Sequence, residues 1–301
     1  MPNEIPFAHE VDFKYGVIQD ISPMIRRVVA RNPSAFTLHG TGTYVIGHGK
    51  VAIVDPGPLV DEHVQALLDA LKNETVTHIL VTHTHIDHSP ACAPVKKAVT
   101  AKTYGYGPHG SGKYAKGESV EEGGDQDFAP DVEIRHGDII EGDGWSVEAV
   151  HTPGHTSNHI CFALREENSL FSGDHVMGWS TSIISPPDGD MADYLASLRL
   201  LLDRDQDQRY WPTHGPAIDR PQSFVRGFIG HRRMREQQIL KNLGEGVDTI
   251  EAMVPRMYKD VHPGLHRAAA RSVFAHMIHM VETGRVAHEG ELSVDARYRA
   301  A

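Results

Sequence analysis

The sequence predicts an α/β fold followed by a small helical module. Over roughly the first 220 residues, short apolar runs typical of buried strands alternate with segments of helical apolar spacing. Beyond that point three helical patterns follow one another. Since 301 residues suit one large domain with an appendage, we expect a domain over residues 1–220 and a C-terminal module over residues 221–301.

The first elements follow from turn residues and apolar spacing. Residues 43–55 (TYVIGHGKVAIVD) contain two apolar runs around a Gly-His-Gly turn and predict two adjacent strands. Apolar side chains three and four positions apart predict a helix over residues 60–72. The run THILVTH predicts a buried strand over residues 77–83, and a helix is expected at about residues 88–98. The first 40 residues give no usable pattern.

A long polar segment follows these elements. Residues 105–130 are rich in Gly and polar side chains and lack periodicity, which predicts a loop that could act as a lid, with Lys113, Tyr114 and Lys116 near a substrate. The elements expected after it are strands at about 132–135, 145–151, 159–164, 169–172 and 209–211, and helices at 190–202, 221–243, 248–259 and 265–283.

Composition excludes several classes of protein. With 40% hydrophobic and 23% charged residues the chain resembles an ordinary globular protein. It has no run of about 18 apolar residues and no secretory leader pattern, so we expect neither a membrane span nor export. Two cysteines cannot build a disulfide framework, which favours a reducing cytoplasm. Cys92 and Cys161 are each expected to be buried.

The charge of the chain is uneven. The net charge is −11, which disfavours a large nucleic-acid surface. Residues 222–301, however, carry 12 Lys and Arg against 9 Asp and Glu, so the C-terminal module is mildly basic on an acidic body. The arginines expected on its helices are Arg232, Arg233, Arg235, Arg267 and Arg271.

One loop concentrates metal-ligand side chains. In the stretch VTHTHIDHSP, which follows the predicted strand at 77–83, three histidines and an aspartate occupy His83, His85, Asp87 and His88. The mutual repulsion of these groups and their desolvation are hard to offset without a cation. A mixed imidazole and carboxylate set suits zinc, with iron or manganese as alternatives. The loop therefore predicts a metal site.

Three further strand ends repeat the same pattern of apolar strand, turn residue and ligand. They place His155 in HTPGHTSNH, Asp174 in LFSGDHVMG and His214 in YWPTHGP. Together with the histidine loop this makes seven candidate ligands at four strand ends, which is enough for two metal ions.

These motifs resemble those of the metallo-β-lactamase fold superfamily. The chain carries H-x-H-x-D-H, T-P-G-H-T, G-D and T-H-G-P in this order. The resemblance covers residues 17–220 and implies an αβ/βα sandwich with the metals at one edge. The resemblance also implies that Asp55 orients the loop without binding metal. It assigns His83, His85 and His155 to the first metal, Asp87, His88 and His214 to the second, and Asp174 to a bridge between them.

The C-terminal part narrows the resemblance. The run HRRMREQQIL after the last motif, the 19-residue step from His155 to Asp174 and the helical tail resemble the lactamase-β-like 2 family. That family implies a small winged-helix-like domain beside the active site. The apolar stripe of the helix at 265–283 predicts that this module packs on the main domain, and contacts in a homodimer are a further expectation.

The resemblance implies a metal-dependent hydrolase with two zinc ions. Such ions can share a water and supply a bridging hydroxide as nucleophile. Asp87 could take the proton from that water. Asn158 and His159 are candidate oxyanion donors; His159 could meet the substrate or serve only as a structural hydrogen-bond partner.

The first expectation for the bond that is cleaved is a phosphodiester of single-stranded RNA, because the animal members of the closer family imply this activity. The alternative is a thioester, ester or lactone of a small metabolite, as in hydroxyacylglutathione hydrolases, although their glutathione-binding stretch is absent. β-Lactams are disfavoured because those enzymes lack the bridging aspartate and are exported. A mononuclear iron persulfide dioxygenase is a weaker alternative, because those relatives share H-x-H-x-D-H but are shorter and lack this tail. A non-catalytic scaffold is also weaker, because all seven ligands are present.

Overall fold

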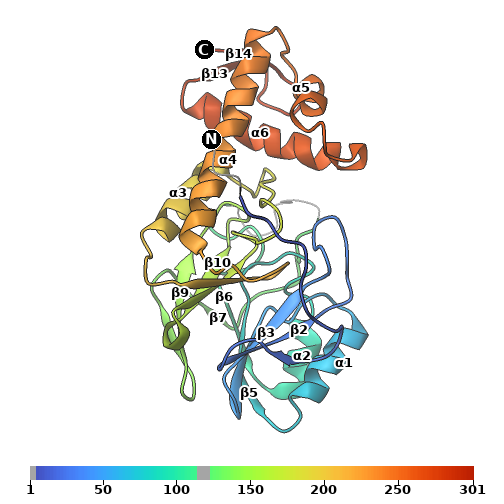
Figure 1. Cartoon of the computed structure of the whole chain (residues 1–301), viewed down its shortest axis with the longest axis vertical. Coiled ribbons are helices and arrows are strands. Elements are labelled where there is room, and N and C mark those ends of the chain that lie inside the picture. The colour runs from blue at the N-terminus through green and yellow to red at the C-terminus, as the bar shows by residue number, and fades with distance from the viewer. Residues whose placement is uncertain (1–4, 114–122) are drawn as a thin grey trace.

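Two β-sheets, flanked by helices, form the larger part of the molecule, and a smaller unit sits at its C-terminal end (Figure 1). The computed structural model describes residues 5–113 and 123–301. Helices α1 and α2 lie on one side of the paired sheets, and α3 and α4 lie on the other. The sequence prediction of an αβ/βα sandwich with a C-terminal winged-helix-like module is therefore confirmed.

The first sheet has seven strands in the order β1 to β7. Strands β1 to β4 are antiparallel, whereas β4 to β7 run parallel. Helix α1 provides the crossover from β4 to β5, and α2 the crossover from β5 to β6. The bounds are β1 Gln19–Asp20, β2 Ile25–Val29, β3 Gly42–Ile46, β4 Lys50–Val54, α1 Asp61–Ala70, β5 Thr75–Leu80, α2 Cys92–Val99, β6 Lys102–Gly105 and β7 Val132–Glu133.

The second sheet has five strands in the order β12-β11-β10-β9-β8. Its strands are antiparallel except for β11 and β12, which run parallel because α3 connects them. The bounds are β8 Ile139–Glu141, β9 Ser146–His151, β10 Ile160–Leu164, a short 3-10 turn Arg165–Glu167, β11 Ser169–Gly173, α3 Met191–Leu202 and β12 Arg209–Pro212.

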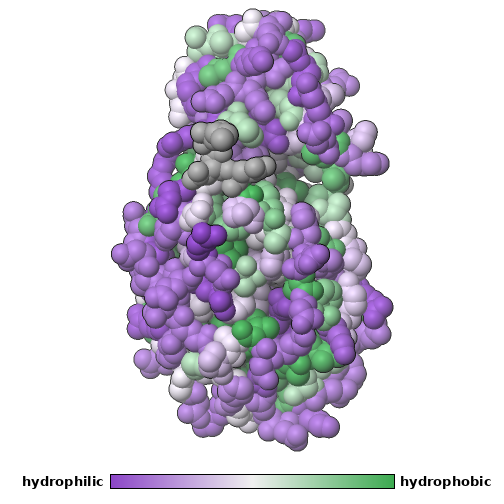
Figure 2. Space-filling view, viewed as in Figure 1, coloured by the Kyte–Doolittle hydropathy of each residue, from purple (hydrophilic) through white to green (hydrophobic). Residues whose placement is uncertain are grey.

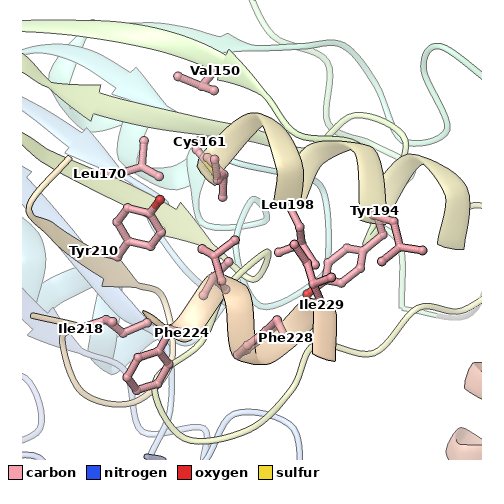
Figure 3. Close-up of a cluster of buried hydrophobic side chains, with 14 of the residues drawn as sticks. Val150, Cys161, Leu170, Tyr194, Leu198, Tyr210, Ile218, Phe224, Phe228 and Ile229 are labelled. Atoms are coloured by element: carbon pink, nitrogen blue, oxygen red, sulfur yellow. The ribbon is translucent and has the colours of Figure 1, made fainter. Parts of the chain in front are cut away.

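Buried aromatic and aliphatic side chains hold the layers together. Tyr44 of the first sheet meets Phe171 and Trp211 of the second, which joins the inner faces of the two sheets. On the outer face of the second sheet, α3 and the first half of α4 cover Leu170 and Tyr210 (Figure 3). Continuous apolar strands such as ICFAL follow from this burial on both faces. Both cysteines are buried, as predicted.

The C-terminal unit contains three helices and a hairpin. The bounds are α4 Pro221–Gly244, α5 Ile250–Met257, a 3-10 turn Pro263–Leu265, α6 His266–Glu282, β13 Val286–Glu289 and β14 Arg297–Ala300. The strands β13 and β14 pair antiparallel and form the wing beside the helices. The sequence analysis missed this hairpin because each strand has only four residues and little apolar character.

The apolar stripe of α6 does not pack on the main domain, and that prediction is wrong. Val273 and Met277 lie in a core made with α5 and the hairpin, which belongs to the C-terminal unit itself. The neighbouring face of α6 contacts the catalytic domain instead, through Ala275 and Arg271. The unit has a core of its own because α6, α5 and the hairpin enclose these side chains.

Helix α4 belongs to both cores. Phe224 and Phe228 lie with α3 in the catalytic domain, whereas Ile239 lies in the core of the C-terminal unit. The boundary predicted after residue 220 therefore falls at the start of a helix that joins the two units, and it stays a prediction. None of the described helices has the length and apolar character needed to cross a bilayer.

Two segments for which the sequence predicted no helix or strand complete the domain. Strand β2 lies inside the first 40 residues and pairs with β3. The predicted loop at 105–130 has no helix or strand in its described parts between β6 and β7. Residues 114–122 of that loop, including Tyr114 and Lys116, lie outside the described residues, while Lys113 forms an ion pair with Asp190 at 3.1 Å.

Candidate metal centre

The carboxyl ends of four strands meet at one edge of the sandwich. The loop after β5 carries His83, His85, Asp87 and His88, and the turn between β9 and β10 carries His155. Asp174 follows β11 directly, and His214 follows β12. The structure brings all seven predicted ligands into three overlapping groups whose ligand atoms lie within 4.8 Å of one another.

The first group contains three imidazoles facing one another. His83 Nε2 lies 3.0 Å from His85 Nδ1, and His155 Nε2 lies 3.1 Å from the same Nδ1 atom. Ligand nitrogens around a tetrahedral zinc ion are separated by about 3.3 Å, given Zn–N distances near 2.0–2.1 Å. The spacing of these nitrogens therefore suits a single cation between them.

The second group combines imidazoles with carboxylates. Asp87 Oδ2 lies 3.1 Å from His214 Nε2 and 3.5 Å from His88 Nε2. Asp174 reaches this group with Oδ1 3.5 Å from His214 Nε2 and Oδ2 3.6 Å from His88 Nε2, and Oδ2 also lies 3.8 Å from His155 Nε2. Asp174 is thus the side chain that contacts members of both groups.

The histidines are held so that their inner nitrogens stay available. Three of them donate their outer Nδ1–H: His155 to Ile183 O at 2.6 Å, His214 to Gly40 O at 3.1 Å and His88 to Asp55 Oδ2 at 3.0 Å. Such bonds fix the tautomer whose Nε2 carries a lone pair. The inner atoms His88 Nε2 and Asp174 Oδ1 are buried without a hydrogen-bond partner, which fits metal ligands.

The electrostatics of the site point the same way. Burial, reinforced by neighbouring histidines, holds the pKa of His83 well below its ordinary value, so this ring is neutral and able to bind metal. Burial opposes the ionised form of Asp174, but His214 and His88 outweigh it and keep its pKa low. Burial would lower the pKa of His214, yet Asp174 and Asp87 raise it to about 10. In the absence of a cation, the positive charge of protonated imidazoles such as His214 balances the negative charge of the carboxylates, and a bound metal ion would replace those protons.

Asp55 organises the centre from behind. One carboxylate oxygen accepts from Thr82 N at 2.8 Å, and the other accepts from Thr82 Oγ1 at 2.7 Å, His88 Nδ1 at 3.0 Å and Thr213 Oγ1 at 3.2 Å. Its backbone adopts a left-handed φ of 49°, which costs free energy and persists at functional sites. Asp55 therefore ties together the loops after β5 and β12, as the family resemblance implied.

His159 and Asn158 lie behind the ligands. His159 is fully buried; its Nε2 accepts from Asp174 N at 3.2 Å, and its Nδ1 lies 2.9 Å from Thr152 Oγ1. Of the two roles open to His159, this geometry favours the structural one. Asn158 donates to Thr84 Oγ1, Gly107 O and Pro108 O, so its amide anchors a loop and is turned toward protein atoms.

Two arginines of the C-terminal unit bind the segment that lies next to the ligands. Arg232 of α4 is 3% exposed and donates to Ser182 O at 2.5 Å. Ser182 Oγ in turn donates to Asp174 O at 2.5 Å, and the next carbonyl, Ile183 O, holds His155. Arg271 of α6 donates to Ser185 Oγ and Pro186 O in the same segment. The module therefore fixes the segment that positions two of the ligands.

The centre opens into a cavity of about 660 Å³. Asp87 and Asp174 lie on its wall with the histidines, while apolar side chains make up much of the rest. The sequence analysis missed two contributors, since neither segment carries a ligand motif. The first is the segment with Asn32, Ser34, Phe36 and Thr37, and the second is the start of α6 with Leu265, Arg267, Ala268 and Arg271.

Two family models match the chain. The model of the Metallo-beta-lactamase superfamily matches residues 37–214, and that of the Beta-lactamase associated winged helix domain matches residues 249–296. A Beta-lactamase-like protein 2 homolog of Caenorhabditis elegans is 33% identical over 261 residues, covering 85% of this chain and 83% of the relative. An atrochrysone carboxyl ACP thioesterase of Cryptosporiopsis sp. is 30% identical over 291 residues, covering 90% of this chain and 84% of the relative.

A solved structure shares the complete architecture. A metallo-beta-lactamase family protein of Thermus thermophilus superposes with a TM-score of 0.76 at 21% identity, covering 94% of this chain and 100% of that one. The family model alone covers more than half of the chain, including every candidate ligand. The chain therefore belongs to the metallo-beta-lactamase superfamily, as a hydrolase-type member that carries the associated winged helix domain.

Proposed function

We propose that the protein is a dinuclear zinc hydrolase that cleaves an acyl thioester or ester. The observation that carries this proposal is the position of Asp174, whose carboxylate contacts both ligand groups at the wall of a largely apolar cavity. A carboxylate shared in this way suits two cations about 3.5–4 Å apart.

The chain supplies binding, charge and proton transfer around such a pair. When bound, two zinc ions would lower the pKa of a water held between them and neutralise negative charge that develops on an attacked carbonyl. Asp87 has a side chain 22% exposed, and its Oδ2 lies 3.1 Å from His214 Nε2. Since Asp87 lines the cavity beside the other ligands, it is placed to accept a proton there and pass it to solvent.

The walls of the cavity favour an acyl group. Phe36, Ile86, Met177, Ile183 and Leu265 line it together with the metal ligands. An apolar wall of this kind stabilises a hydrocarbon chain. The relative named as a carboxyl ACP thioesterase, which matches 90% of this chain, supports the same class of substrate.

Single-stranded RNA is the second candidate, and one observation favours it. Arg267 and Arg271 lie at the cavity wall, where they would contact phosphate groups. Two other arginines of the predicted basic tail are used inside the protein, since Arg232 is buried and Arg235 donates to Met257 O at 2.7 Å. The C-terminal unit thus offers less basic surface than its composition suggested, which ranks RNA below the acyl substrates.

Metal analysis and two substrate panels test the proposal. We expect about two zinc ions per chain, hydrolysis of the short thioester octanoyl-N-acetylcysteamine, and loss of that activity on chelation. Cleavage of single-stranded RNA without thioester hydrolysis would move the function to the second candidate. One iron per chain with oxygen uptake would contradict the hydrolase chemistry altogether.

A further inference from the structure

A second cavity, of about 700 Å³, lies next to the metal cavity. It is formed between α6 with the hairpin loop on one side and the segment before α3 on the other. Its principal side chains are Lys113, Met191, Phe274, Ile278, Leu292 and Val294. Its volume lies within the usual range for small-molecule sites, about 300–1,000 Å³.

The two cavities share a wall. Arg267 and Arg271 line both of them, and both arginines stand on the face of α6 that continues to Phe274 and Ile278. These positions lie three or four residues apart, so they form one row along the helix. In Figure 1, α6 runs across the end of the catalytic domain, and Figure 2 shows a narrowing of the molecular surface at this level. The two cavities therefore adjoin each other along α6.

Positive charge gathers at the shared wall. The two guanidinium groups line both cavities, the metal cavity adds several apolar side chains, and the second cavity has mixed walls. Within the second cavity Lys113 and Asp190 form an ion pair at 3.1 Å, and Glu282 adds one carboxylate near the C-terminal end of α6. Arg271 is oriented by its bonds to Ser185 Oγ and Pro186 O. Paired guanidinium groups suit a phosphate or diphosphate.

We propose that the second cavity binds the nucleotide half of a coenzyme A thioester, with the diphosphate at Arg267 and Arg271 and the acyl group in the metal cavity. The inference rests on the proposed function, and it names the substrate class of that site. A nucleoside needs an apolar wall for its base beyond the phosphates, which Phe274 and Ile278 provide.

The hydrolysis itself balances without a further co-reactant. Water adds to the thioester carbonyl, the carbon–sulfur bond breaks, and the products are a carboxylic acid and the free thiol of coenzyme A. The proton needed by the leaving sulfur comes from the attacking water. The nucleotide half takes no part in these bonds, so its binding at α6 affects substrate affinity and positioning.

Comparison of a long with a short thioester tests this assignment. Octanoyl-coenzyme A and octanoyl-N-acetylcysteamine present the same reacting bond, but only the first carries the nucleotide half. We expect kcat/KM for the coenzyme A ester to be at least tenfold higher, mainly through a lower KM. In Arg267→Gln, and in Val294→Glu, which adds a negative charge at an exposed position of the cavity, this advantage should shrink to less than threefold.

Arg299→Gln is the matched control, because Arg299 lies on the exposed hairpin strand β14 and lines neither cavity. It should keep the full advantage. Arg271 is not used as the test position, since it also holds the segment that supports the ligands. Calorimetric titration with desulfo-coenzyme A, which lacks a thiol able to bind zinc, provides a readout without turnover and should show weakened binding in Arg267→Gln.

The outcomes separate this inference from the proposed function. Equal hydrolysis of both thioesters, unchanged in Arg267→Gln, would overturn the inference and leave the thioesterase intact. Equal rates with the coenzyme A ester and with the corresponding 4′-phosphopantetheine ester would also overturn it, since the nucleoside would then contribute nothing. If neither thioester is hydrolysed, but desulfo-coenzyme A binds and Arg267→Gln abolishes binding, the cavity assignment stands and the proposed function fails.

Discussion

The molecule holds two buried clusters rich in histidine, and they solve the problem of buried charge in different ways. At the metal centre, His83, His85 and His155 turn nitrogens toward one another at 3.0–3.1 Å. In the C-terminal unit, Glu236 of α4 accepts from His279 Nδ1 at 2.9 Å and from Arg285 Nη1 at 2.6 Å. In the second cluster, His279 and Arg285 neutralise the charge of Glu236. In the first cluster, ring nitrogens of three histidines face each other.

The difference teaches how to recognise a metal site. Histidines gather in both places, but among the described residues the groups with convergent ligand atoms all belong to the first cluster. What distinguishes it is that the outer nitrogens bind acceptors such as Ile183 O and Gly40 O, so the inner nitrogens point toward the centre of the site. In the C-terminal cluster the imidazole of His279 is used as a donor to a carboxylate.

The largest effect should come from the ligand shared by both groups. Asp174→Ala removes the carboxylate that contacts both sets of imidazoles, so hydrolysis should fall by about 10³-fold or more, as for loss of an essential catalytic group. The metal content should drop below two ions per chain, and circular dichroism should show an unchanged fold. Hydrolysis near the wild-type rate would contradict the shared-ligand arrangement.

A smaller effect is expected behind the ligands. Asp55→Asn keeps the size of the side chain but removes the charge that holds His88 and Thr82. Zinc affinity, measured by competition with a chromophoric chelator, should weaken by about 10–100-fold. Replacing the exposed Asp143 in the same way serves as a control for charge alone, because Asp143 lies outside the site and pairs with Lys50 on the surface. Equal affinities in both variants would contradict the role given to Asp55.

The C-terminal cluster should respond in stability and not in metal content. Glu236→Gln removes a carboxylate that is 7% exposed and leaves Arg285 and His279 without their charged partner. Loss of one partner of a fully buried pair costs about 3–5 kcal/mol. Since the Arg285 side chain is 37% exposed and can turn to water, the free energy of unfolding from urea titration should fall by less, about 1–3 kcal/mol. The zinc content should be that of the wild type. A loss of zinc in this variant would show that the two clusters are not independent.

The smallest effect concerns pH. Burial lowers the pKa of His276 from 6.5 to about 4, so the unfolded chain takes up a proton below pH 6.5 that the folded protein does not accept until about pH 4. Stability therefore falls as the pH drops through this window. In His276→Leu the slope of unfolding free energy between pH 6 and 4.5 should be shallower than in the wild type, by up to about 1.4 kcal/mol per pH unit. Identical slopes would show that His276 does not titrate in this way.

Much of the metal centre could be predicted from the sequence because its ligands follow strand ends in short motifs. A strand fixes where its last residue lies, so the four motifs had to converge once the strands belonged to one sandwich. His159 illustrates what such patterns leave open, since only the structure shows its Nε2 accepting from Asp174 N. Spacing identifies a histidine near the site but not the direction of its ring.

The cavity and the supporting contacts could not be predicted because they depend on tertiary packing. Phe36 stands in a segment without periodicity, yet it lines the substrate cavity. Arg232 sits in a basic run that suggests a solvated helix face, but the contact between α4 and the catalytic domain buries it against Ser182 O. The hairpin of β13 and β14 is too short to give a strand pattern. None of these contacts is local in sequence.

The most direct test of the account is the metal content of the purified protein, measured by inductively coupled plasma mass spectrometry beside that of Asp174→Ala. The account predicts about two zinc ions per chain in the wild type and fewer than two in the variant. One iron ion per chain, or a zinc content that Asp174→Ala leaves unchanged, would contradict the dinuclear centre on which the proposed function depends.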